Sequence, residues 1–371
     1  MNINKSKNIC FPFVGDSVGG SHVSSVLLIN QLLKKKKKVT IIIHKKGKLE
    51  KFLNKKKIKY FLYPTPYLVG ASSFSFFNFI NLCISFPFIC YAILKYKIDI
   101  IHTNDMKIHQ TWVLPSFFLK KRQIWHQRTL FPQSRLSKFL IRFSTDIICI
   151  SKYVKNSIPN QVISKVEIIY NSIENYKKKI NIKKLRSKIL SKYQKRTKII
   201  SFVGNLQQIK QPNFLIELVY KLKLEKLDFI FCFFGDDKEF LINKMKTLIR
   251  KLGISKNIKF MGFKSPIEPW IKSSHVLVAS SKGDGFGRTI IEAMNLQVPV
   301  IASNFGGHKE IIKNKVNGIL CDTKDTDNFA KLLKEFLYNK GLRKKITYKA
   351  FIFSKNFYSS KQFNKFKRYY E

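Results

Sequence analysis

Short apolar runs alternate with helical segments along almost the whole chain, and this alternation restricts the fold more than any other feature. Segments with helical spacing, such as 22–33 and 107–119, lie between most of the runs. Continuous apolar strands separated by helices indicate a parallel sheet that is covered on both faces. In the first half the predicted strands are 8–14, 39–44, 58–63, 99–102, 123–125, 147–150 and 166–169.

A second alternation begins after a lysine-rich stretch at 176–198, which predicts a domain boundary there. We therefore expect an α/β fold with two doubly wound, Rossmann-like domains, 1–175 and 176–354. The aromatic and basic tail, from about 355 to 371, is expected to form a closing helix that packs back on the first domain. The predicted strands of the second domain are 199–203, 229–234, 258–261, 276–279 and 298–302.

The stretch 280–299, SSKGDGFGRTIIEAMNLQVP, runs from an apolar strand through a glycine-rich turn into a helix. Asp284 lies in the turn, and Glu292 follows eight residues later in the second turn of that helix. The first amides of such a helix suit an anion, and Gly285 and Gly287 leave the backbone open to a phosphate. The pattern favours a sugar-nucleotide pocket, with a plain strand-to-helix turn as the alternative.

Glycine turns also follow the first strand of each predicted domain. Gly15, Gly19 and Gly20 follow the first strand of the chain, and Gly204 follows the strand at 199–203. Open parallel sheets bind ligands outside the carboxyl ends of their strands. Both turns are therefore expected to face a ligand cleft between the two domains.

The chain is strongly basic, with 70 Lys and Arg against 22 Asp and Glu, for a formal net charge of +48. The first 150 residues hold 25 basic and 5 acidic residues, so no single basic module stands out. Such a charge attracts anionic lipid surfaces and anionic substrates. A nucleic-acid partner is disfavoured, because the chain has no basic ladder interleaved with aromatic residues, zinc-ligand spacing or recognition-helix signature.

The six cysteines form no C-x-x-C pair, which predicts a reducing, cytoplasmic setting and no metal site. Asp236 and Asp237 follow a glycine in a turn, and a capping role is favoured over metal binding. The apolar run at 9–14 is too short for a signal peptide and is interpreted as a strand.

Residues 61–94 contain no Lys, Arg, Asp or Glu. The part at 74–94 is long enough to span a membrane, although Asn78, Asn81 and Pro87 interrupt it. A buried helix, an amphipathic helix that dips into a membrane surface and a spanning helix all remain open.

The segment Asp284 to Glu292 resembles the paired-acid signature of glycosyltransferase family 4, which comprises retaining enzymes with the GT-B fold. The resemblance covers nearly the whole chain, because further motifs follow in the family's order. These motifs are VGGSH at 18–22, IDIIHTND at 98–105, IWHQRT at 124–129, ICISKYVKNSI at 148–158, IIYNSIE at 168–174, FVGNLQQIKQP at 202–212, FMGF at 260–263 and NFGGHKEII at 304–312.

The resemblance implies roles for individual residues. Glu292 is expected to bind the ribose hydroxyls of a nucleotide, and Lys210 to neutralise its diphosphate. Asp284 is expected to hold hydroxyls of the donor sugar, with His126 beside the reacting carbon, so these two are the implied catalytic residues. His22 is a candidate acceptor contact. The implied donor-binding residues are Gly19, Gly20, Gly204, Asn205, Lys210, Gly285, Phe286, Gly287, Arg288 and Glu292.

Two positions depart from the family pattern. Asn205 stands where the family usually has Arg, so one phosphate cation is missing unless Arg288 or a nearby lysine compensates. Asp284 stands where the family usually has Glu, and its shorter side chain leaves the identity of the donor sugar open.

The expected function is transfer of a hexose from a nucleotide diphosphate sugar to an acceptor, with retention of configuration and without metal or cofactor. The expected acceptor is a lipid-linked cell-surface glycan, as in polysaccharide or lipopolysaccharide biosynthesis. The enzyme is expected in the cytoplasm, peripherally bound to the anionic inner face of the cell membrane. The alternatives are a sugar-nucleotide epimerase on the same fold and a basic nucleic-acid-binding protein.

Overall fold

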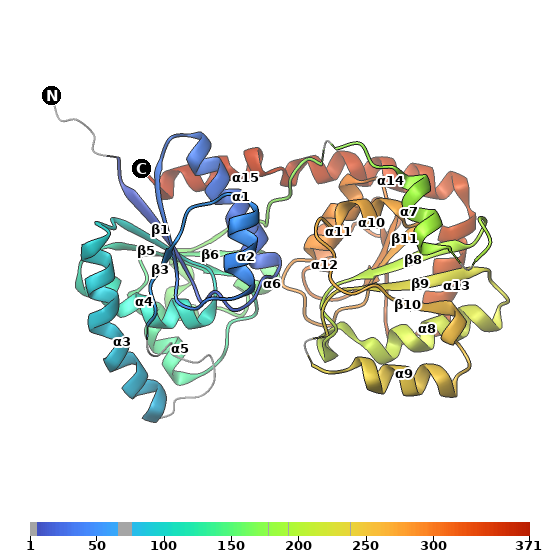
Figure 1. Cartoon of the computed structure of the whole chain (residues 1–371), viewed down its shortest axis with the longest axis horizontal. Coiled ribbons are helices and arrows are strands. Elements are labelled where there is room, and N and C mark those ends of the chain that lie inside the picture. The colour runs from blue at the N-terminus through green and yellow to red at the C-terminus, as the bar shows by residue number, and fades with distance from the viewer. Residues whose placement is uncertain (1–5, 66–75, 177, 192, 238) are drawn as a thin grey trace. The chain divides into compact units, whose positions relative to one another are not determined.

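The computed structural model describes residues 6–65, 76–176, 178–191, 193–237 and 239–371. Residues 66–75, which belong to the uncharged stretch at 61–94, lie outside the described residues. The chain divides into two compact units (Figure 1). Unit 1 comprises Met1–Glu174 and Ser359–Glu371, and unit 2 comprises Asn175–Tyr358.

Unit 1 is built on a parallel sheet of seven strands in the order β3-β2-β1-β4-β5-β6-β7. All seven strands predicted for the first half of the chain are present. The order places β1 in the interior of the sheet, between β2 and β4, as in other doubly wound folds. The strands are β1 (Asn8–Phe13), β2 (Lys38–Ile43), β3 (Phe61–Leu62), β4 (Ile100–Thr103), β5 (Arg122–Gln127), β6 (Asp146–Cys149) and β7 (Val166–Ile168).

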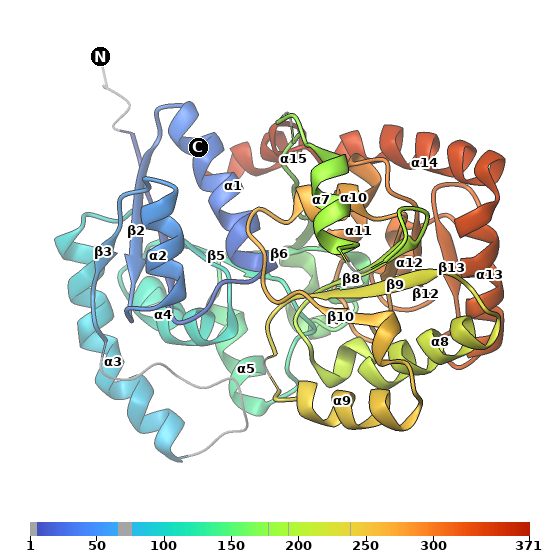
Figure 2. The ribbon, with the colours of Figure 1, turned by 45° about the vertical axis from the view of Figure 1, so that its right-hand side comes forward.

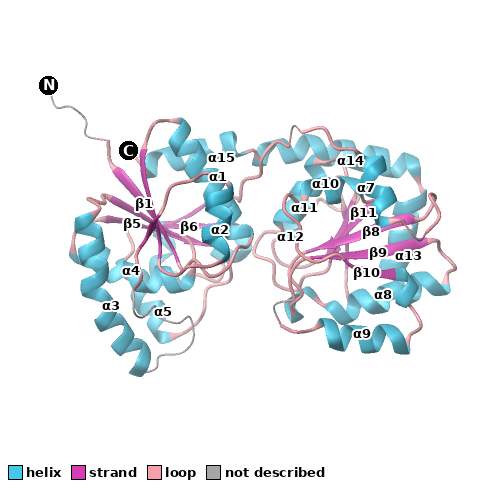
Figure 3. Cartoon of the chain, viewed as in Figure 1, coloured by secondary structure: helices cyan, strands magenta, loops and turns pink. Residues whose placement is uncertain are grey.

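Helices cover both faces of this sheet (Figure 3). Because side chains of a strand alternate between faces, Ile9 and Phe11 of β1 share a core with α1, α2 and α15, whereas Cys10 packs with α3 and α4. The helices of unit 1 are α1 (Gly20–Lys34), α2 (Lys48–Lys55), α3 (Phe76–Lys95), α4 (Met106–Phe118), α5 (Arg135–Leu140), α6 (Lys152–Lys155) and α15 (Ser359–Phe366).

Unit 2 contains a parallel sheet of six strands in the order β10-β9-β8-β11-β12-β13 (Figure 2). The five predicted strands are present, and β13 is an additional short strand at the edge that the sequence analysis missed. The prediction of two doubly wound α/β sheets is therefore confirmed. The strands are β8 (Lys198–Val203), β9 (Phe229–Phe234), β10 (Ile258–Phe260), β11 (Val276–Ala279), β12 (Val300–Ser303) and β13 (Ile319–Cys321).

The core of unit 2 also lies on both faces of its sheet. The larger cluster joins Phe231 and Phe233 to α8, α9 and α13, while the smaller joins Ile230 and Cys232 to α7. The helices are α7 (Ile182–Ile189), α8 (Pro212–Leu224), α9 (Ile242–Lys251), α10 (Glu268–Ser273), α11 (Arg288–Asn295), α12 (His308–Ile311), α13 (Thr326–Tyr338) and α14 (Lys340–Ser354).

The last part of the uncharged stretch, from residue 76, lies in α3, which packs against α4 through one face and exposes apolar side chains on the other. It thus combines features of the buried and the surface helix that the sequence left open. Within the described parts of the chain, no helix has both the length and the apolar character needed to cross a bilayer.

Candidate functional site

The carboxyl edge of the unit 2 sheet collects the loops that the sequence analysis singled out. Residues 204–205 follow β8, 280–287 follow β11, and 304–307 follow β12. Because these strands are parallel neighbours, their carboxyl ends meet at one edge. The amide of Gly307 donates to the carbonyl of Asp284 at 3.0 Å, which ties the second loop to the third.

Asp284 is the centre of a charged cluster in this edge. Its Oδ1 accepts a hydrogen bond from Nζ of Lys210, and its Oδ2 lies 3.3 Å from Nε2 of His308. Lys210 ends the short 3₁₀ helix η3 (Gln208–Lys210), which the loop after β8 forms before α8 begins. Nδ1 of His308 lies 3.0 Å from Oγ of Ser303, the last residue of β12. Three separate loops therefore converge on one carboxylate.

The pKa of the Asp284 carboxyl depends on its burial and on its contacts with Lys210 and His308. Burial acts to raise the pKa, but the cation of Lys210 and the hydrogen bond from His308 outweigh it and hold the pKa well below its usual range. Asp284 is therefore an anion at neutral pH, and Lys210 is its counterion. A second anion brought to this edge would meet Lys210 and the start of α11.

The DGFG bend turns into α11 through Gly287, the residue that caps the helix. Gly287 has φ of +90°, and a Cβ there would lie 2.8 Å from the ring of His308. The bend thus needs glycine at this position for conformation as well as space. The ring of Phe286 is buried against Phe357, with centroids 5.6 Å apart, so this side chain contributes packing.

Glu292 lies one turn into α11 and is almost fully buried. Its Oε1 accepts a hydrogen bond of 2.7 Å from Nε of Arg288, four residues earlier on the same helix face. Burial raises the pKa of Glu292, and the neighbouring guanidinium only partly offsets that effect. Arg288 and Glu292 form an ion pair at the amino end of the helix, where the macrodipole is positive.

The turn after β8 is held by close backbone packing. A Cβ on Gly235 would lie 1.9 Å from the carbonyl oxygen of Gly204, so the two glycine backbones touch. Oδ1 of Asn205 accepts a long hydrogen bond, 3.4 Å, from the amide of Asp236. The predicted capping role is confirmed for Asp237, whose carboxylate accepts from two amides at the start of α9, at 2.7 and 3.0 Å.

In unit 1, the glycine loop after β1 leads into α1. Gly19 caps the helix in an extended conformation, and α1 begins at Gly20. The amide of Gly19 donates to Nδ1 of His22 at 3.2 Å, so His22 completes the cap while its ring lies 5.7 Å from that of Phe13. The structure thus gives His22 a local structural contact at this loop.

His126, near the carboxyl end of β5, is only 2% exposed. Its Nδ1 lies 3.0 Å from Nε2 of His102, whose Nδ1 in turn lies 2.6 Å from the hydroxyl of Tyr370 near the carboxyl terminus. Burial, followed by the charge of Arg128, holds the pKa of His126 well below its usual range, so the ring is neutral. Its Nε2 has no hydrogen-bond partner in the described residues. His126 is one of the residues that line a small cavity of about 10 Å³.

Arg128 lines the same cavity and donates hydrogen bonds to polar side chains of three other elements. Its guanidinium donates to Oδ1 of Asn104 at 2.7 and 3.0 Å, to Oδ1 of Asn171 at 2.6 Å and to Oγ of Ser25 at 3.2 Å. Asn104 follows β4, Asn171 follows β7 and Ser25 lies on α1, while Arg128 itself follows β5. One buried cation therefore connects four elements at the carboxyl edge of the sheet. The motif around His126 contained this residue, but spacing alone did not distinguish it from the many other basic residues.

The structure brings together Lys210 with Asp284 and Arg288 with Glu292 in unit 2, and Gly19 with His22 in unit 1. His308 was missed, although the motif at 304–312 contains it. The signal that could have found it is geometric, since a loop that follows the neighbouring parallel strand must reach the same sheet edge.

Within the described residues, no group of three or more His, Cys, Asp or Glu side chains is placed to hold a metal ion.

Two family models match the chain, one in each half. The model described as "Glycosyltransferase Family 4" matches residues 18–175, and the model described as "Glycosyl transferases group 1" matches residues 183–352. Between them they account for most of both units.

Individual relatives are similar over a large part of the chain. An uncharacterised glycosyltransferase of Methanocaldococcus jannaschii is 27% identical over 290 residues, which are 72% of this chain and 77% of that protein. The UDP-Gal:alpha-D-GlcNAc-diphosphoundecaprenol alpha-1,3-galactosyltransferase of Escherichia coli is 27% identical over 206 residues, 53% of this chain and 52% of that protein. The crystal structure of Anabaena HepE in complex with UDP and glucose has a TM-score of 0.84 and 19% identity, over 97% of this chain and 98% of that one.

Proposed function

Because the chain belongs to the family 4 glycosyltransferases with the GT-B fold, we propose that it transfers a sugar from a nucleotide diphosphate sugar to an acceptor. The observation that carries this proposal is the meeting of Lys210 and Asp284 beside the start of α11. A cation, a carboxylate and a helix amino end together suit a donor that has an anionic leaving group and sugar hydroxyls.

Each of these groups has a distinct role in the proposed reaction. As the bond between sugar and phosphate breaks, negative charge develops on the departing diphosphate and positive charge on the sugar. Lys210 and the first amides of α11 stabilise the departing diphosphate, which lowers the barrier. Asp284 accepts hydrogen bonds from hydroxyls of the donor sugar, and Glu292 accepts them from the ribose.

In this proposal Lys210 interacts with two anions, the carboxylate of Asp284 and the diphosphate of the donor. Without a donor it neutralises Asp284, and with a donor bound it is shared between Asp284 and the diphosphate. Arg288 is a second cation at the same helix end and compensates for the arginine that Asn205 replaces. We infer that these protein cations and amides supply the positive charge that the leaving group needs, so that the reaction proceeds without a metal and without a further cofactor.

We also propose retention of configuration, which rests on the family resemblance alone. The neutral ring of His126, buried in unit 1, is assigned to the sugar side of the reaction on the same basis. The proposed acceptor is a glycan carried on a lipid, for which the name of the Escherichia coli relative, with its diphosphoundecaprenol-linked acceptor, gives support.

Thermal stabilisation by a panel of nucleotide diphosphate sugars tests the donor site, because a ligand that binds the folded state raises the melting temperature. At a donor concentration of about 100 times Kd the folded state gains about 3 kcal/mol, so we expect a rise of several degrees for the right donor. Glu292→Ala should abolish this rise, and Glu292→Gln, which can still accept from Arg288, should reduce it.

Glu335→Ala is the matched control, since Glu335 is an exposed helical glutamate of the same unit. This variant should respond to the donor as the unchanged protein does. If Glu292→Ala keeps the full response while remaining folded, the ribose contact is wrongly assigned. If no nucleotide sugar stabilises the unchanged protein, the proposed donor class is wrong.

A further inference from the structure

Helix α3 has two faces of opposite character. One face packs into unit 1 through five buried side chains, Leu82, Ser85, Ile89, Ala92 and Ile93. The opposite face exposes large apolar side chains and no charged residue before Lys95, the last residue of the helix. These exposed side chains are Phe76, Phe79, Ile84, Phe88, Tyr91 and Leu94.

Aromatic contacts extend this face onto the neighbouring elements. Phe86 of α3 meets Phe118 at the end of α4, with ring centroids 5.6 Å apart. Phe117 meets Phe143 of the 3₁₀ helix η1 (Ile141–Phe143) at 5.0 Å, and Phe143 meets Phe139 of α5 at 5.1 Å. Phe117, Phe118 and Phe139 are themselves exposed.

We call the exposed face of α3 together with Phe117, Phe118 and Phe139 the aromatic surface. Figure 1 draws α3 at the outer edge of unit 1, with α4 next to it. Single exposed apolar residues are common on proteins, but a contiguous group of this extent marks an interaction surface.

The segment that carries the aromatic surface is basic. Residues 76–143 contain ten Lys and Arg but only two acids, Asp99 and Asp105, a formal net charge of +8. Both acids are engaged within unit 1. Asp99 accepts from the amide of Asn8 and pairs with Lys121 at 3.8 Å, and Asp105 caps α4.

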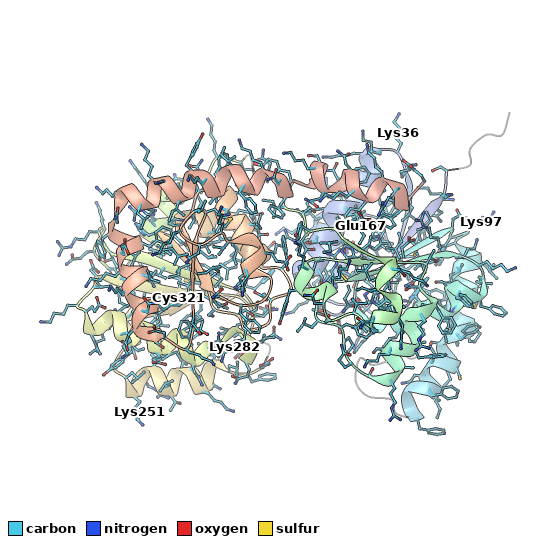
Figure 4. The ribbon with its side chains drawn as sticks, turned by 180° about the vertical axis from the view of Figure 1, so that it is seen from behind. Lys36, Lys97, Glu167, Lys251, Lys282 and Cys321 are labelled. Carbon is cyan, nitrogen blue, oxygen red and sulfur yellow. The ribbon has the colours of Figure 1, made fainter. Side chains whose placement is uncertain are left out.

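Several of these cations lie where the apolar residues end. Lys95 and Lys97 follow the apolar face of α3, and Lys120 follows Phe117 and Phe118 at the end of α4. Figure 4 shows Lys97 at the end of α3 that leads into β4, on the outside of unit 1. Lysines at the ends of an apolar helix can reach the headgroups while the apolar side chains lie deeper.

We propose that the aromatic surface is a docking surface for an anionic lipid bilayer, in which α3 lies along the interface. Its apolar side chains enter the boundary between headgroups and acyl chains, and the flanking lysines contact anionic headgroups. A helix of 20 residues is about 30 Å long, so its exposed apolar side chains are spread along that length of the bilayer surface.

A second copy of this chain is a poor occupant of the surface. Each copy carries a formal net charge of +48, and like charges oppose such pairing. An anionic bilayer complements that charge. The inference goes beyond the proposed function and does not depend on it, since the aromatic surface lies in unit 1 and binding to lipid requires no sugar transfer.

Co-sedimentation of the full chain with vesicles tests the proposal. The vesicles contain either phosphatidylcholine alone or phosphatidylcholine with one third phosphatidylglycerol, at 20 mM and 500 mM NaCl. We expect binding to the anionic vesicles at both salt concentrations, weaker at 500 mM, because screening removes the electrostatic part of the attraction but not the apolar part.

The variant for this test replaces three well-exposed residues of the surface with serine: Phe76 (72% exposed), Leu94 (60%) and Phe118 (69%). Its partition onto the anionic vesicles should fall at least tenfold at 500 mM NaCl. The matched control likewise replaces three exposed apolar residues of unit 2 with serine: Phe240, Tyr348 and Leu224. This control should bind the anionic vesicles as the unchanged protein does. Melting temperatures within a few degrees of the unchanged protein establish that both variants are folded.

Equal binding of both triple variants and the unchanged protein would overturn the proposal, since the basic charge alone would then explain attraction to lipid. It would also be overturned if the unchanged protein were a dimer by analytical ultracentrifugation and the surface variant a monomer. Stabilisation by the nucleotide sugar is measured in parallel and should be the same in all three proteins. A failure of lipid binding is thereby distinguished from a failure of the donor site.

Discussion

At the scale of single residues, Asp284 is the carboxylate that both Lys210 and His308 contact. We expect Asp284→Asn to lower the free energy of unfolding by about 2 kcal/mol at pH 7, because it leaves the partly buried Lys210 without its counterion. The pKa of Asp284 is depressed in the folded state, so its stabilising contribution is present above the unfolded pKa, about 4.

The difference in stability between the unchanged protein and Asp284→Asn should therefore be constant above about pH 5 and shrink as the pH falls below about 4. Urea unfolding at a series of pH values measures it. Asp327→Asn is the control, because Asp327 forms an exposed pair with Lys221 that contributes little. A difference that does not vary with pH would mean that the charge of Asp284 is not what stabilises the cluster.

The sequence predicted the residues of this cluster unevenly, for a physical reason. Asp284 and Lys210 were found because they belong to motifs with recognisable spacing. His308 was not, since its contact with Asp284 depends on how two loops meet across neighbouring strands. Arg128 was likewise missed, because its surroundings come from β4, β7 and α1, and no local pattern shows which of 70 basic residues is buried.

At the scale of elements, the bend before α11 depends on Gly287. We expect Gly287→Ala to lower the free energy of unfolding by about 1–3 kcal/mol, because φ is +90° there and the new Cβ would press on the ring of His308. Chemical denaturation measures the change. The same variant should weaken the stabilisation by a nucleotide sugar, since the first amides of α11 would shift.

Gly341→Ala is the matched control for this substitution. Gly341 lies in the first turn of α14 with no left-handed φ, and its added Cβ would meet only an ordinary contact of 3.6 Å with Asn339. Alanine should leave the stability unchanged or raise it by up to about 1 kcal/mol. Equal effects of the two substitutions would show that the bend tolerates a side chain.

The amino-terminal cap of α4 provides a prediction about pH. Burial raises the pKa of Asp105 to about 6, although its carboxylate accepts a hydrogen bond of 3.1 Å from the amide of Ile108. The pKa of Asp105 is higher in the folded state than in the unfolded chain, where it is about 4. The contribution of Asp105 to the stability of the folded state is therefore fully present below about pH 4 and is lost as the pH rises through about 6.

Relative to Asp105→Asn, the unchanged protein should therefore lose stability between about pH 4 and pH 7, by at most about 3 kcal/mol. Asparagine is an equally good cap and does not titrate, so the variant should lack this component of the pH dependence. Thermal unfolding of both proteins across this range measures the difference. Identical pH profiles would contradict the assigned pKa.

The elements themselves were largely predictable, because buried parallel strands leave continuous apolar runs in the sequence. The strand β13 was missed since Ile319–Cys321 has only three residues and lies at the sheet edge. The tail at about 355–371 was predicted as one closing helix, but the structure divides it into the 3₁₀ helix η5 (Lys355–Phe357), α15 and the 3₁₀ helix η6 (Lys367–Tyr369). Composition shows an apolar or basic bias, yet it does not show where a helix must stop so that Ser359 can bond to Ile173 and Gln31 in unit 1.

At the scale of the whole molecule, the charge is balanced between the units but not within either of them. Unit 1 has 32 basic and 8 acidic residues and unit 2 has 38 and 14, so each carries a formal net charge of +24. The two-sheet architecture could be predicted because periodicity is unaffected by surface charge. The effect of that charge on stability could not, since it depends on the distances between lysines in the folded state.

Repulsion among like charges should make the stability of each unit depend on salt. We expect the melting temperature to rise by about 3 °C or more between 10 mM and 150 mM NaCl, because the Debye length falls from about 30 Å to about 8 Å and screens the lysines from one another. Sucrose at the same osmolality is the control and should not reproduce the rise, and choline chloride should reproduce it. A melting temperature that stays constant or falls would mean that local ion pairs, such as Lys210 with Asp284, stabilise the folded chain more than the excess charge destabilises it.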